Sequence, residues 1–344
     1  MENEKIELTE LSELGEFGLI DRLTKDIKIH NKSTVKGIGD DAAVISNREQ
    51  TLVSVDVLIE GVHFDMTYMP LKHLGYKAAV VNFSDIYAMN GTPTQIVVGM
   101  GISSKFSVEA VEEIFSGIKL ACDNYKVDLV GGDTTASRSG LFISITVIGK
   151  AKKEDIVYRD GAKANDLLCV SGNLGAAYTG LLILEREKAA FMADPNMQPE
   201  LYGYDYILER QLKPEARQDI VAKLKELEIK PTAMIDVSDG LASEILHLCK
   251  DSKVGCRIFE DRIPMHQKAI DTAKEFDIVP CVAALNGGED YELLFTVKQE
   301  DYEKVKDMED VRIIGFMTAE ENVAELITTD EHIIPIEAQG FKHF

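Results

Sequence analysis

The stretch I-D-V-S-D-G-L at residues 235–241 joins a predicted strand to a predicted helix and carries two carboxylates in the turn between them. Five further acidic stretches lie beside glycine or another small residue, mostly next to an apolar run. A carboxylate at the end of a buried strand is costly unless a cation meets it. The five stretches read G-I-G-D-D-A-A-V (37–44), S-V-D-V-L-I-E-G-V-H-F (54–64), N-F-S-D (82–85), V-G-G-D-T-T (130–135) and G-G-E-D-Y-E (287–292).

The chain cannot neutralise all these carboxylates with its own cations, because 59 acidic residues face 37 lysines and arginines. Mg²⁺ takes oxygen ligands, combining a few carboxylates with water and substrate phosphates. Glycines at 37, 39, 131 and 132 would let backbone N–H groups approach phosphates closely. The sequence therefore predicts metal-assisted phosphate chemistry, with candidate metal ligands at Asp56, Asp85, Asp133, Asp236 and Asp239.

Composition excludes several classes of protein. The net charge of −22 argues against nucleic acid and anionic membranes as partners, since both attract basic surfaces. There is no apolar run long enough to span a bilayer, and the polar, acidic N-terminus is unlike a signal peptide. Five dispersed cysteines without a C-x-x-C pair are typical of reduced thiols, so we expect a cytoplasmic protein.

The 344 residues are enough for two domains, and a charged, turn-rich segment at 151–166 places the expected boundary near residue 150. We expect an α/β architecture of two domains with mixed sheets, 1–150 and 151–344. Residues 189–206 read as a surface insertion. Helices are expected at 7–30, 71–89, 108–124, 174–187, 215–227, 240–251, 266–276 and 300–308, and strands at 51–56, 95–102, 127–130, 141–149, 167–171, 232–236, 254–259, 290–297 and 311–316.

Each acidic stretch also has a purely structural interpretation. Ser238 or Asp239 would suit the N-cap of the helix at 240–251, Asp85 could be a satisfied polar group in a helix interface, and His63 alone is more often structural than a ligand. No phosphate loop of the G-x-x-x-x-G-K-[ST] type is present, nor the kinase motif set. An ATP-using enzyme of this sequence would therefore rely on positioning and charge neutralisation.

In this order and at these separations, the motifs resemble those of the thiamine-monophosphate kinase family. That family lies within the superfamily of aminoimidazole-ribonucleotide synthetase and selenophosphate synthetase. The resemblance runs over nearly the full chain, from G-E-F at 15–17 to the terminal G-F-K-H-F at 340–344. It implies a two-domain aminoimidazole-ribonucleotide-synthetase-like fold. The N-terminal mixed sheet would bind ATP and Mg²⁺ and dimerise by joining its twin, and the C-terminal α/β domain would complete the active site.

The resemblance further implies direct, in-line transfer of the ATP γ-phosphoryl group to thiamine monophosphate, giving thiamine diphosphate. Four of the implied metal ligands, Asp56, Asp85, Asp133 and Asp236, would also act catalytically. Val55 stands where relatives can carry Thr, so a metal contact there would come from the main chain or Ser54. The implied sites are several Mg²⁺ ions at Asp41, Ser54, Asp56, Asp85, Asp133, Asp236 and Asp239, ATP at Gly132, Asp133, Arg159 and Ser238, and thiamine monophosphate at His63, Glu289 and Phe341.

Two alternatives stay open at this point. Aminoimidazole-ribonucleotide synthetase is the nearest rival within the superfamily, and residues 61–64 and 287–293 disfavour it. A non-enzymatic protein that binds divalent ions or nucleotides is the rival from another class. No EF-hand loop is present, and a buffer has no need of His63 or Arg159. Release of ADP only when thiamine monophosphate is added would separate an enzyme from a binder.

Overall fold

The computed structural model describes residue 19 and residues 22–36, 44–46 and 48–339. By its internal contacts the chain divides into two compact units. Unit 1 comprises Met1–Ile86 and Thr92–Lys152, and unit 2 comprises Tyr87–Gly91 and Lys153–Phe344. Most of the expected helix at 7–30 and the glycine-rich stretch at 37–43 lie outside the described residues. Within the described part, no helix is both long and apolar enough to cross a membrane.

Unit 1 is built on a four-stranded mixed sheet in the order β3-β6-β4-β5. Pairing is antiparallel between β3 and β6 and between β6 and β4, and parallel between β4 and β5. A small antiparallel pair, β1 and β2, precedes it in the chain. The strands are β1 (Thr34–Lys36), β2 (Val44–Ile45), β3 (Gln50–Ile59), β4 (Thr92–Ile102), β5 (Asp128–Ala136) and β6 (Phe142–Ala151).

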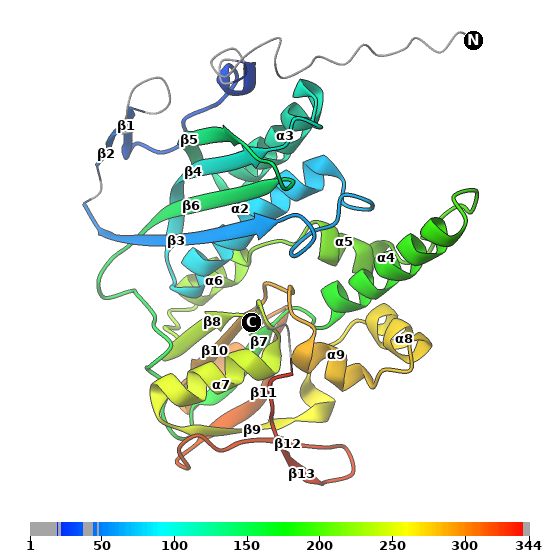
Figure 1. The fold of residues 1–344 in the computed structure, drawn as a ribbon. Coiled ribbons are helices and arrows are strands. Elements are labelled where there is room, and N and C mark those ends of the chain that lie inside the picture. The colour runs from blue at the N-terminus through cyan, green and yellow to red at the C-terminus, as the bar shows by residue number, and fades with distance from the viewer. Residues whose placement is uncertain (1–18, 20–21, 37–43, 47, 340–344) are drawn as a thin grey trace. The chain divides into compact units, whose positions relative to one another are not determined.

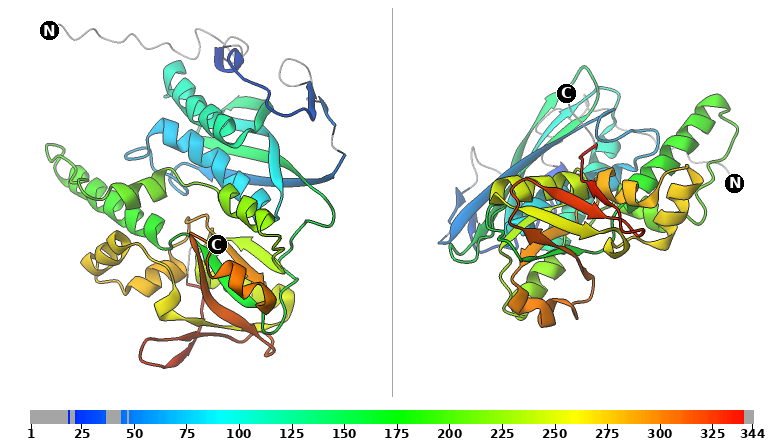
Figure 2. Two further views of the ribbon diagram at one scale, coloured as in Figure 1. Left: turned by 180° about the vertical axis from the view of Figure 1, so that it is seen from behind. Right: turned by 90° about the horizontal axis from the view of Figure 1, so that it is seen from below.

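Helices α2 (Leu71–Ala88) and α3 (Val108–Tyr125) lie on one face of this sheet, as the front and back views both show (Figures 1 and 2). The two helices pack so closely that a Cβ at Gly75 would lie 1.9 Å from the carbonyl oxygen of Ile114. Only glycine allows this approach of two backbones. The expected N-cap of α3 is confirmed, because the Ser107 hydroxyl accepts a hydrogen bond from the Ala110 N–H.

Alternate residues of β3 divide between the two faces of the sheet. The serine and aspartate at positions 54 and 56 are half-buried, whereas Val53, Val55, Val57 and Ile59 are 64%, 56%, 43% and 44% exposed. An edge strand with a row of exposed β-branched residues is a ready surface for association. Ser54 and Asp56 of β3 therefore alternate with an apolar outer stripe.

Unit 2 contains a seven-stranded sheet in the order β13-β12-β9-β11-β7-β10-β8, antiparallel except for the parallel β12–β9 pair. Its strands are β7 (Leu167–Ser171), β8 (Ala233–Asp236), β9 (Gly255–Phe259), β10 (Leu293–Val297), β11 (Val311–Thr318), β12 (Ala324–Ile327) and β13 (Ile333–Pro335). Its α-helices are α4 (Ala176–Ala193), α5 (Asp205–Leu212), α6 (Gln218–Glu226), α7 (Leu241–Ser252), α8 (Gln267–Glu275), α9 (Pro280–Asn286) and α10 (Tyr302–Val305).

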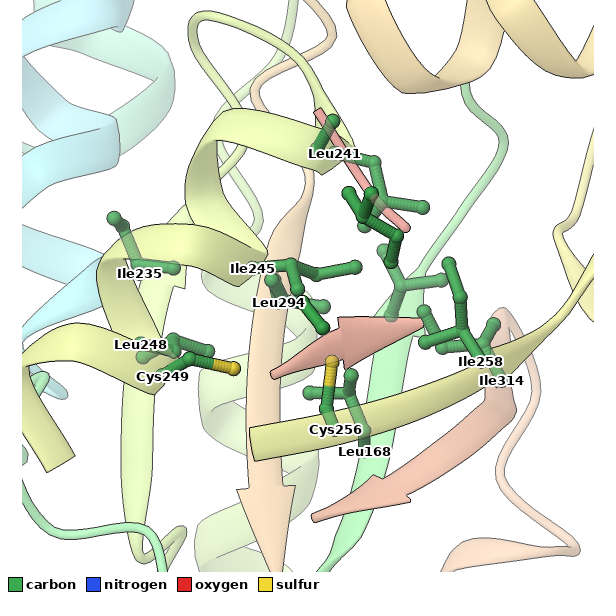
Figure 3. Packing of buried hydrophobic residues seen from close by; sticks show 14 of the residues in the cluster. Leu168, Ile235, Leu241, Ile245, Leu248, Cys249, Cys256, Ile258, Leu294 and Ile314 are labelled. Atoms are coloured by element: carbon green, nitrogen blue, oxygen red, sulfur yellow. The ribbon is translucent and has the colours of Figure 1, made fainter. Parts of the chain in front are cut away.

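The core of unit 2 forms where α7 packs on the sheet (Figure 3). Leu241, Ile245 and Leu248 recur at helical spacing on one face of α7 and are at most 1% exposed. They meet Ile258 and Leu294 of the strands, which are fully buried. This packing anchors α7, and with it the acidic turn at 236–240 that precedes the helix.

The expected fold class, α/β with mixed sheets, is confirmed. Several strand predictions were too short, and two of these strands carry expected site residues. Strand β3 does not end at Asp56 but continues to Ile59, and β5 continues from the apolar run at 128–130 through the whole G-G-D-T-T motif. Of the expected insertion at 189–206, the first residues extend α4 and the last begin α5, while 194–200 are exposed.

Candidate functional site

The first group of site residues lies between β3 and α2 of unit 1. The Ser54 hydroxyl donates a hydrogen bond of 2.5 Å to Oδ2 of Asp85, which brings strand and helix together. Asn82, one turn before Asp85 on α2, accepts the backbone N–H of Asp56 on its Oδ1 at 3.1 Å. The strand places Asp56 on the same face as Ser54, since the two are two residues apart.

Asp56 and Asp85 repel one another. Burial, and secondarily the charge of Asp85, raises the pKa of Asp56 to about 6. Two carboxylates in this arrangement favour either a shared proton or a cation. The donor set of this group consists of oxygens alone, from Ser54, Asp56 and Asp85, and this fits the hard-ligand preference of Mg²⁺.

His63 follows β3 in the turn at 60–64. The backbone N–H of Ile59 donates to its Nδ1 at 3.1 Å. In the neutral ring, Nδ1 is then the acceptor and Nε2 carries the proton, an assignment made from this hydrogen bond. The turn therefore presents His63 as a hydrogen-bond donor through Nε2, which suits contact with a phosphate oxygen.

Gly132 and Asp133 lie on β5, at the opposite edge of the sheet from Asp56. Following the register across the sheet, Asp56 pairs with Ile145, Ile145 with Val98, and Val98 with Gly132. Neighbouring strands are about 4.8 Å apart, so these three steps separate the backbones by roughly 14 Å. Two oxygens on one Mg²⁺ lie within about 4 Å of each other. One sheet therefore does not bring Asp133 to the Asp56–Asp85 pair.

The second group of site residues belongs to unit 2. Asp236 ends β8 and is 4% exposed, and Ser238 and Asp239 follow in the turn before α7. The prediction that Ser238 or Asp239 caps this helix was wrong, because the N-cap is Gly240, whose φ of +117° favours glycine. Instead, Glu244 of the first helical turn reaches back and accepts the Asp239 N–H at 2.9 Å. Neither Ser238 nor Asp239 is therefore explained as an N-cap.

Glu244 is a functional candidate that sequence reasoning missed. It is 2% exposed, and burial raises its pKa to about 7, although the hydrogen bond from the Asp239 N–H and the charge of Arg159 both act to lower it. Arg159 lies in an exposed turn, and its carbonyl accepts the Ser252 hydroxyl at 2.8 Å. A signal was available, since an acid in the first turn after S-D-G commonly pairs with the N-terminal N–H groups of a helix.

Glu289 is joined to the same turn through the backbone. Its N–H donates to the Ser238 carbonyl at 2.7 Å, and the Tyr291 N–H donates to the Val237 carbonyl at 2.9 Å. Its carboxylate accepts the Gln211 amide at 2.9 Å. Of the expected residues of unit 2, those at 236, 238, 239 and 289 are thus gathered at the end of β8 and on two loops that are hydrogen-bonded to each other.

The remaining expected ligands divide as follows. Asp41 and Phe341 lie outside the described residues. Among residues 22–36, 44–46 and 48–339, no three His, Cys, Asp or Glu side chains form a group that could hold a metal. The structure brings together Ser54, Asp56 and Asp85 in unit 1, and within that unit it leaves Asp133 on the far edge strand.

Comparison with known proteins adds the evolutionary context. Residues 39–151 match the family model "AIR synthase related protein, N-terminal domain", and residues 163–327 match its C-terminal domain. Thiamine-monophosphate kinase of Bacillus subtilis (strain 168) is 34% identical over 341 residues, covering 96% of this chain and all of the relative. The Aquifex aeolicus (strain VF5) enzyme of the same name is 34% identical over 335 residues, covering 97% and 99%.

Among solved structures, one described as "AaThiL complexed with AMPPCP and TMP" superposes with a TM-score of 0.73 and 33% identity. The match covers 98% of this chain and 99% of that one. The two family models together span more than half of the chain, and both named relatives exceed 30% identity over almost their whole length. The chain belongs to the thiamine-monophosphate kinase family of AIR synthase related proteins.

Proposed function

We propose that this protein transfers the γ-phosphoryl group of ATP to thiamine monophosphate and so forms thiamine diphosphate. The observation that carries the proposal is the match, 33% identical over 98% of this chain, to a structure that holds AMPPCP and TMP. The five free thiols are typical of a reducing compartment, and we place the protein in the cytoplasm.

Several Mg²⁺ ions would be held by Ser54, Asp56 and Asp85 in unit 1 and by Asp236 and Asp239 in unit 2, with Asp41 and Asp133 as further ligands. Bound there, they would supply charge neutralisation for the phosphates. Metal binding would lower the pKa of Asp56, which burial and the unscreened charge of Asp85 raise to about 6. Asp85 is oriented for the same role by the Ser54 hydroxyl.

ATP would lie against Gly132, Asp133, Arg159 and Ser238. The guanidinium of Arg159 can bind two phosphate oxygens at once. Of the proposed metal ligands, the domain at 1–150 would supply the larger share and the domain at 151–344 the remainder.

The acceptor would meet His63, Glu289 and Phe341. His63 would donate from Nε2 to the acceptor phosphate, the tautomer fixed by the Ile59 N–H. The carboxylate of Glu289 suits a cation, and thiamine carries one in its thiazolium ring. Phe341 offers an aromatic face for a heterocycle. Transfer would be direct, without a phospho-enzyme. The Ser54 hydroxyl does donate to the Asp85 carboxylate, but we assign both groups to the metal site and not to a nucleophile and its base.

We propose a homodimer in which β3 of one protomer pairs with β5 of its partner. Both are edge strands of the four-stranded sheet, and β3 exposes an apolar stripe of three valines and an isoleucine. A two-fold axis would form both β3–β5 junctions at once. Each junction would bring Asp133 of one chain toward Asp56 and Asp85 of the other, which removes the separation of roughly 14 Å between their backbones within one sheet.

Mixed dimers test this arrangement. Asp56→Asn and Asp133→Asn homodimers should both be nearly inactive. A mixed dimer, purified through two different affinity tags, would hold one site with both changes and one intact site. The mixed dimer should recover about half of the activity of the unmutated protein. A mixed dimer as inactive as its two parents would place both aspartates of a site in one chain, and a monomeric chain in solution would end the proposal.

The proposed reaction is tested by ADP release over a panel of phosphorylated acceptors in saturating Mg²⁺ and ATP. Release should require thiamine monophosphate and should not occur with a phosphorylated ribonucleotide, the kind of acceptor that the rival synthetase implies. A binding protein would release no ADP with any acceptor. Release with the ribonucleotide alone would overturn the proposal in favour of the synthetase.

A further inference from the structure

The segment Gly288–Tyr291 has an unusual backbone. Gly288, Glu289 and Tyr291 have φ angles of +70°, +58° and +51°. The left-handed region costs a residue with a Cβ roughly 1–2 kcal/mol. Such conformations persist only when surrounding contacts enforce them, and they gather at functional sites. The contacts that hold this segment therefore determine the backbone conformation at Glu289 and the direction of its side chain.

The backbone that follows Glu289 is fixed through two buried acids, Asp290 and Glu292. Asp290 is fully buried, and its carboxylate accepts the N–H groups of Gly175 and Ala177, at 2.7 and 3.4 Å, where α4 begins. Nη2 of Arg210 donates to the carbonyl of Asp290 at 2.8 Å and to Glu292 at 2.8 Å. This guanidinium thus ties the segment to α5.

Glu292 is the second of these acids and is 1% exposed. It accepts the Ser171 hydroxyl at 2.5 Å and Nη1 of Arg217 at 2.6 Å, besides Arg210. Gly172 gives it room, since a Cβ there would lie 2.1 Å from its Oε1. Two guanidinium groups therefore neutralise Glu292, as a buried carboxylate requires.

The hydrogen-bond donor that contacts the Glu289 carboxylate differs in kind from those that contact Glu292. Its Oε2 accepts the side-chain amide of Gln211 at 2.9 Å. Gln211 is 4% exposed and follows Arg210 on α5, so adjacent residues of one helix hold the backbone of the segment and the carboxylate of Glu289. An amide donor fixes the orientation of a carboxylate without cancelling its charge. The same segment thus contains one acid neutralised by arginines and one oriented by a neutral group.

We propose that Gln211 is a positioning residue, which aims the Glu289 carboxylate at the acceptor through the hydrogen bond from its side-chain amide. This inference rests on the proposed function, in which Glu289 contacts thiamine monophosphate. It assigns a role to α5, the helix that ends the surface insertion. It also accounts for an amide at a buried position beside an acid, where lysine or arginine would form an ion pair.

The test uses steady-state kinetics of the full-length protein. Gln211→Met keeps the volume and removes the donor, so KM for thiamine monophosphate should rise about tenfold, as expected for losing one hydrogen bond to a charged group. Gln211→Lys should raise it further, because the ammonium would neutralise Glu289. KM for ATP should change less than twofold in both. The control is Gln267→Met on α8, where an exposed glutamine donates to Asp271 at 2.8 Å, and it should change neither constant.

Combining Gln211→Met with Glu289→Gln separates positioning from a structural role. If Gln211 acts through Glu289, its effect on the acceptor KM should disappear in the Glu289→Gln background. Additive effects, an acceptor KM within twofold of the parent in Gln211→Met, or an equal rise in KM for ATP would each overturn the inference. If Gln211→Met does not fold, Gln211→Asn, which is too short to reach, must show the same selective rise. An unchanged acceptor KM in Glu289→Gln alone would instead refute the acceptor-site assignment.

Discussion

Gly132 offers the sharpest test of how the G-G-D-T-T motif works. The sequence suggests that this glycine lets the backbone approach a phosphate. In the structure, the absence of a side chain at Gly132 also allows β5 to pack closely on β4, because a Cβ there would lie 2.1 Å from the carbonyl oxygen of Val98. Carbon and oxygen do not approach closer than about 3 Å without strain, so Gly132→Ala must push β5 away from β4 by about 1 Å.

The expected cost of Gly132→Ala is about 1–3 kcal/mol, the usual range for forcing extra atoms into a packed region. For a domain of this size, each kcal/mol lowers the midpoint of thermal unfolding by about 2–4 °C. The matched control is Gly131→Ala, where the nearest atom to the new Cβ is Cγ1 of Val97 at an ordinary 3.7 Å. That variant should unfold within about 2 °C of the parent, since its effect on stability should be within about 0.5 kcal/mol.

Thermal unfolding of the two variants without ligands, followed by circular dichroism, decides the matter. If β4 and β5 approach closely at Val98, the midpoint of thermal unfolding should fall clearly for Gly132→Ala and hardly change for Gly131→Ala. Equal midpoints for both variants would refute the close approach of β4 and β5 at Val98. In that case, any loss of ATP binding in Gly132→Ala would be assigned to the phosphate contact alone.

Three further predictions concern the acidic groups. Asp56→Asn and Asp85→Asn should each lower kcat at least about 100-fold while the ligand-free thermal midpoint stays level or rises, because each removes a like-charge repulsion; near-normal kcat at saturating Mg²⁺ would contradict the metal assignment. Burial raises the pKa of Asp290 to about 7 despite the charge of Arg210. Between about pH 4 and 7 the folded protein therefore keeps a proton that the unfolded chain releases. The contribution of this proton to the free energy of unfolding is lost as pH rises through that range. Asp290→Asn should therefore gain stability relative to the parent by up to a few kcal/mol across that window in urea unfolding, and a constant difference would contradict the shift. Mg²⁺ with a non-hydrolysable ATP analogue should raise the thermal midpoint by more than the sum of the separate shifts, because the phosphates complete the metal coordination, whereas additive shifts would indicate separate sites.

Local patterns predicted much of the fold. The strand at 167–171 and the helices at 71–89, 108–124 and 240–251 agree with the structure to within one or two residues. The helices at 108–124 and 240–251 each have one apolar face, and the strand at 167–171 is a short continuous apolar run, both of which are strong local signals. Helix α9 was missed although Pro280 at its first turn is a typical helix start, because seven residues hold too little periodicity to read.

Long-range pairing limited the rest. Strand β5 runs through two glycines because β4 pairs with it in parallel, and no local propensity reveals such a partner. The strand order β3-β6-β4-β5 is not sequential, so the sequence could not show that Asp56 and Asp133 lie on opposite edges. Gln211 and Glu289 are 78 residues apart, and their contact depends on how α5 packs in unit 2.

The central claim is direct phosphoryl transfer from ATP to thiamine monophosphate, and γ-labelled ATP tests it most directly. The full-length protein is incubated with Mg²⁺ and labelled ATP, first alone and then with thiamine monophosphate, and the label is followed by chromatography. The account predicts an unlabelled protein in the first step and label in thiamine diphosphate, in equal amount to the ADP formed, in the second. Label bound covalently to the protein before the acceptor is added, or label released as inorganic phosphate without thiamine diphosphate, would contradict it.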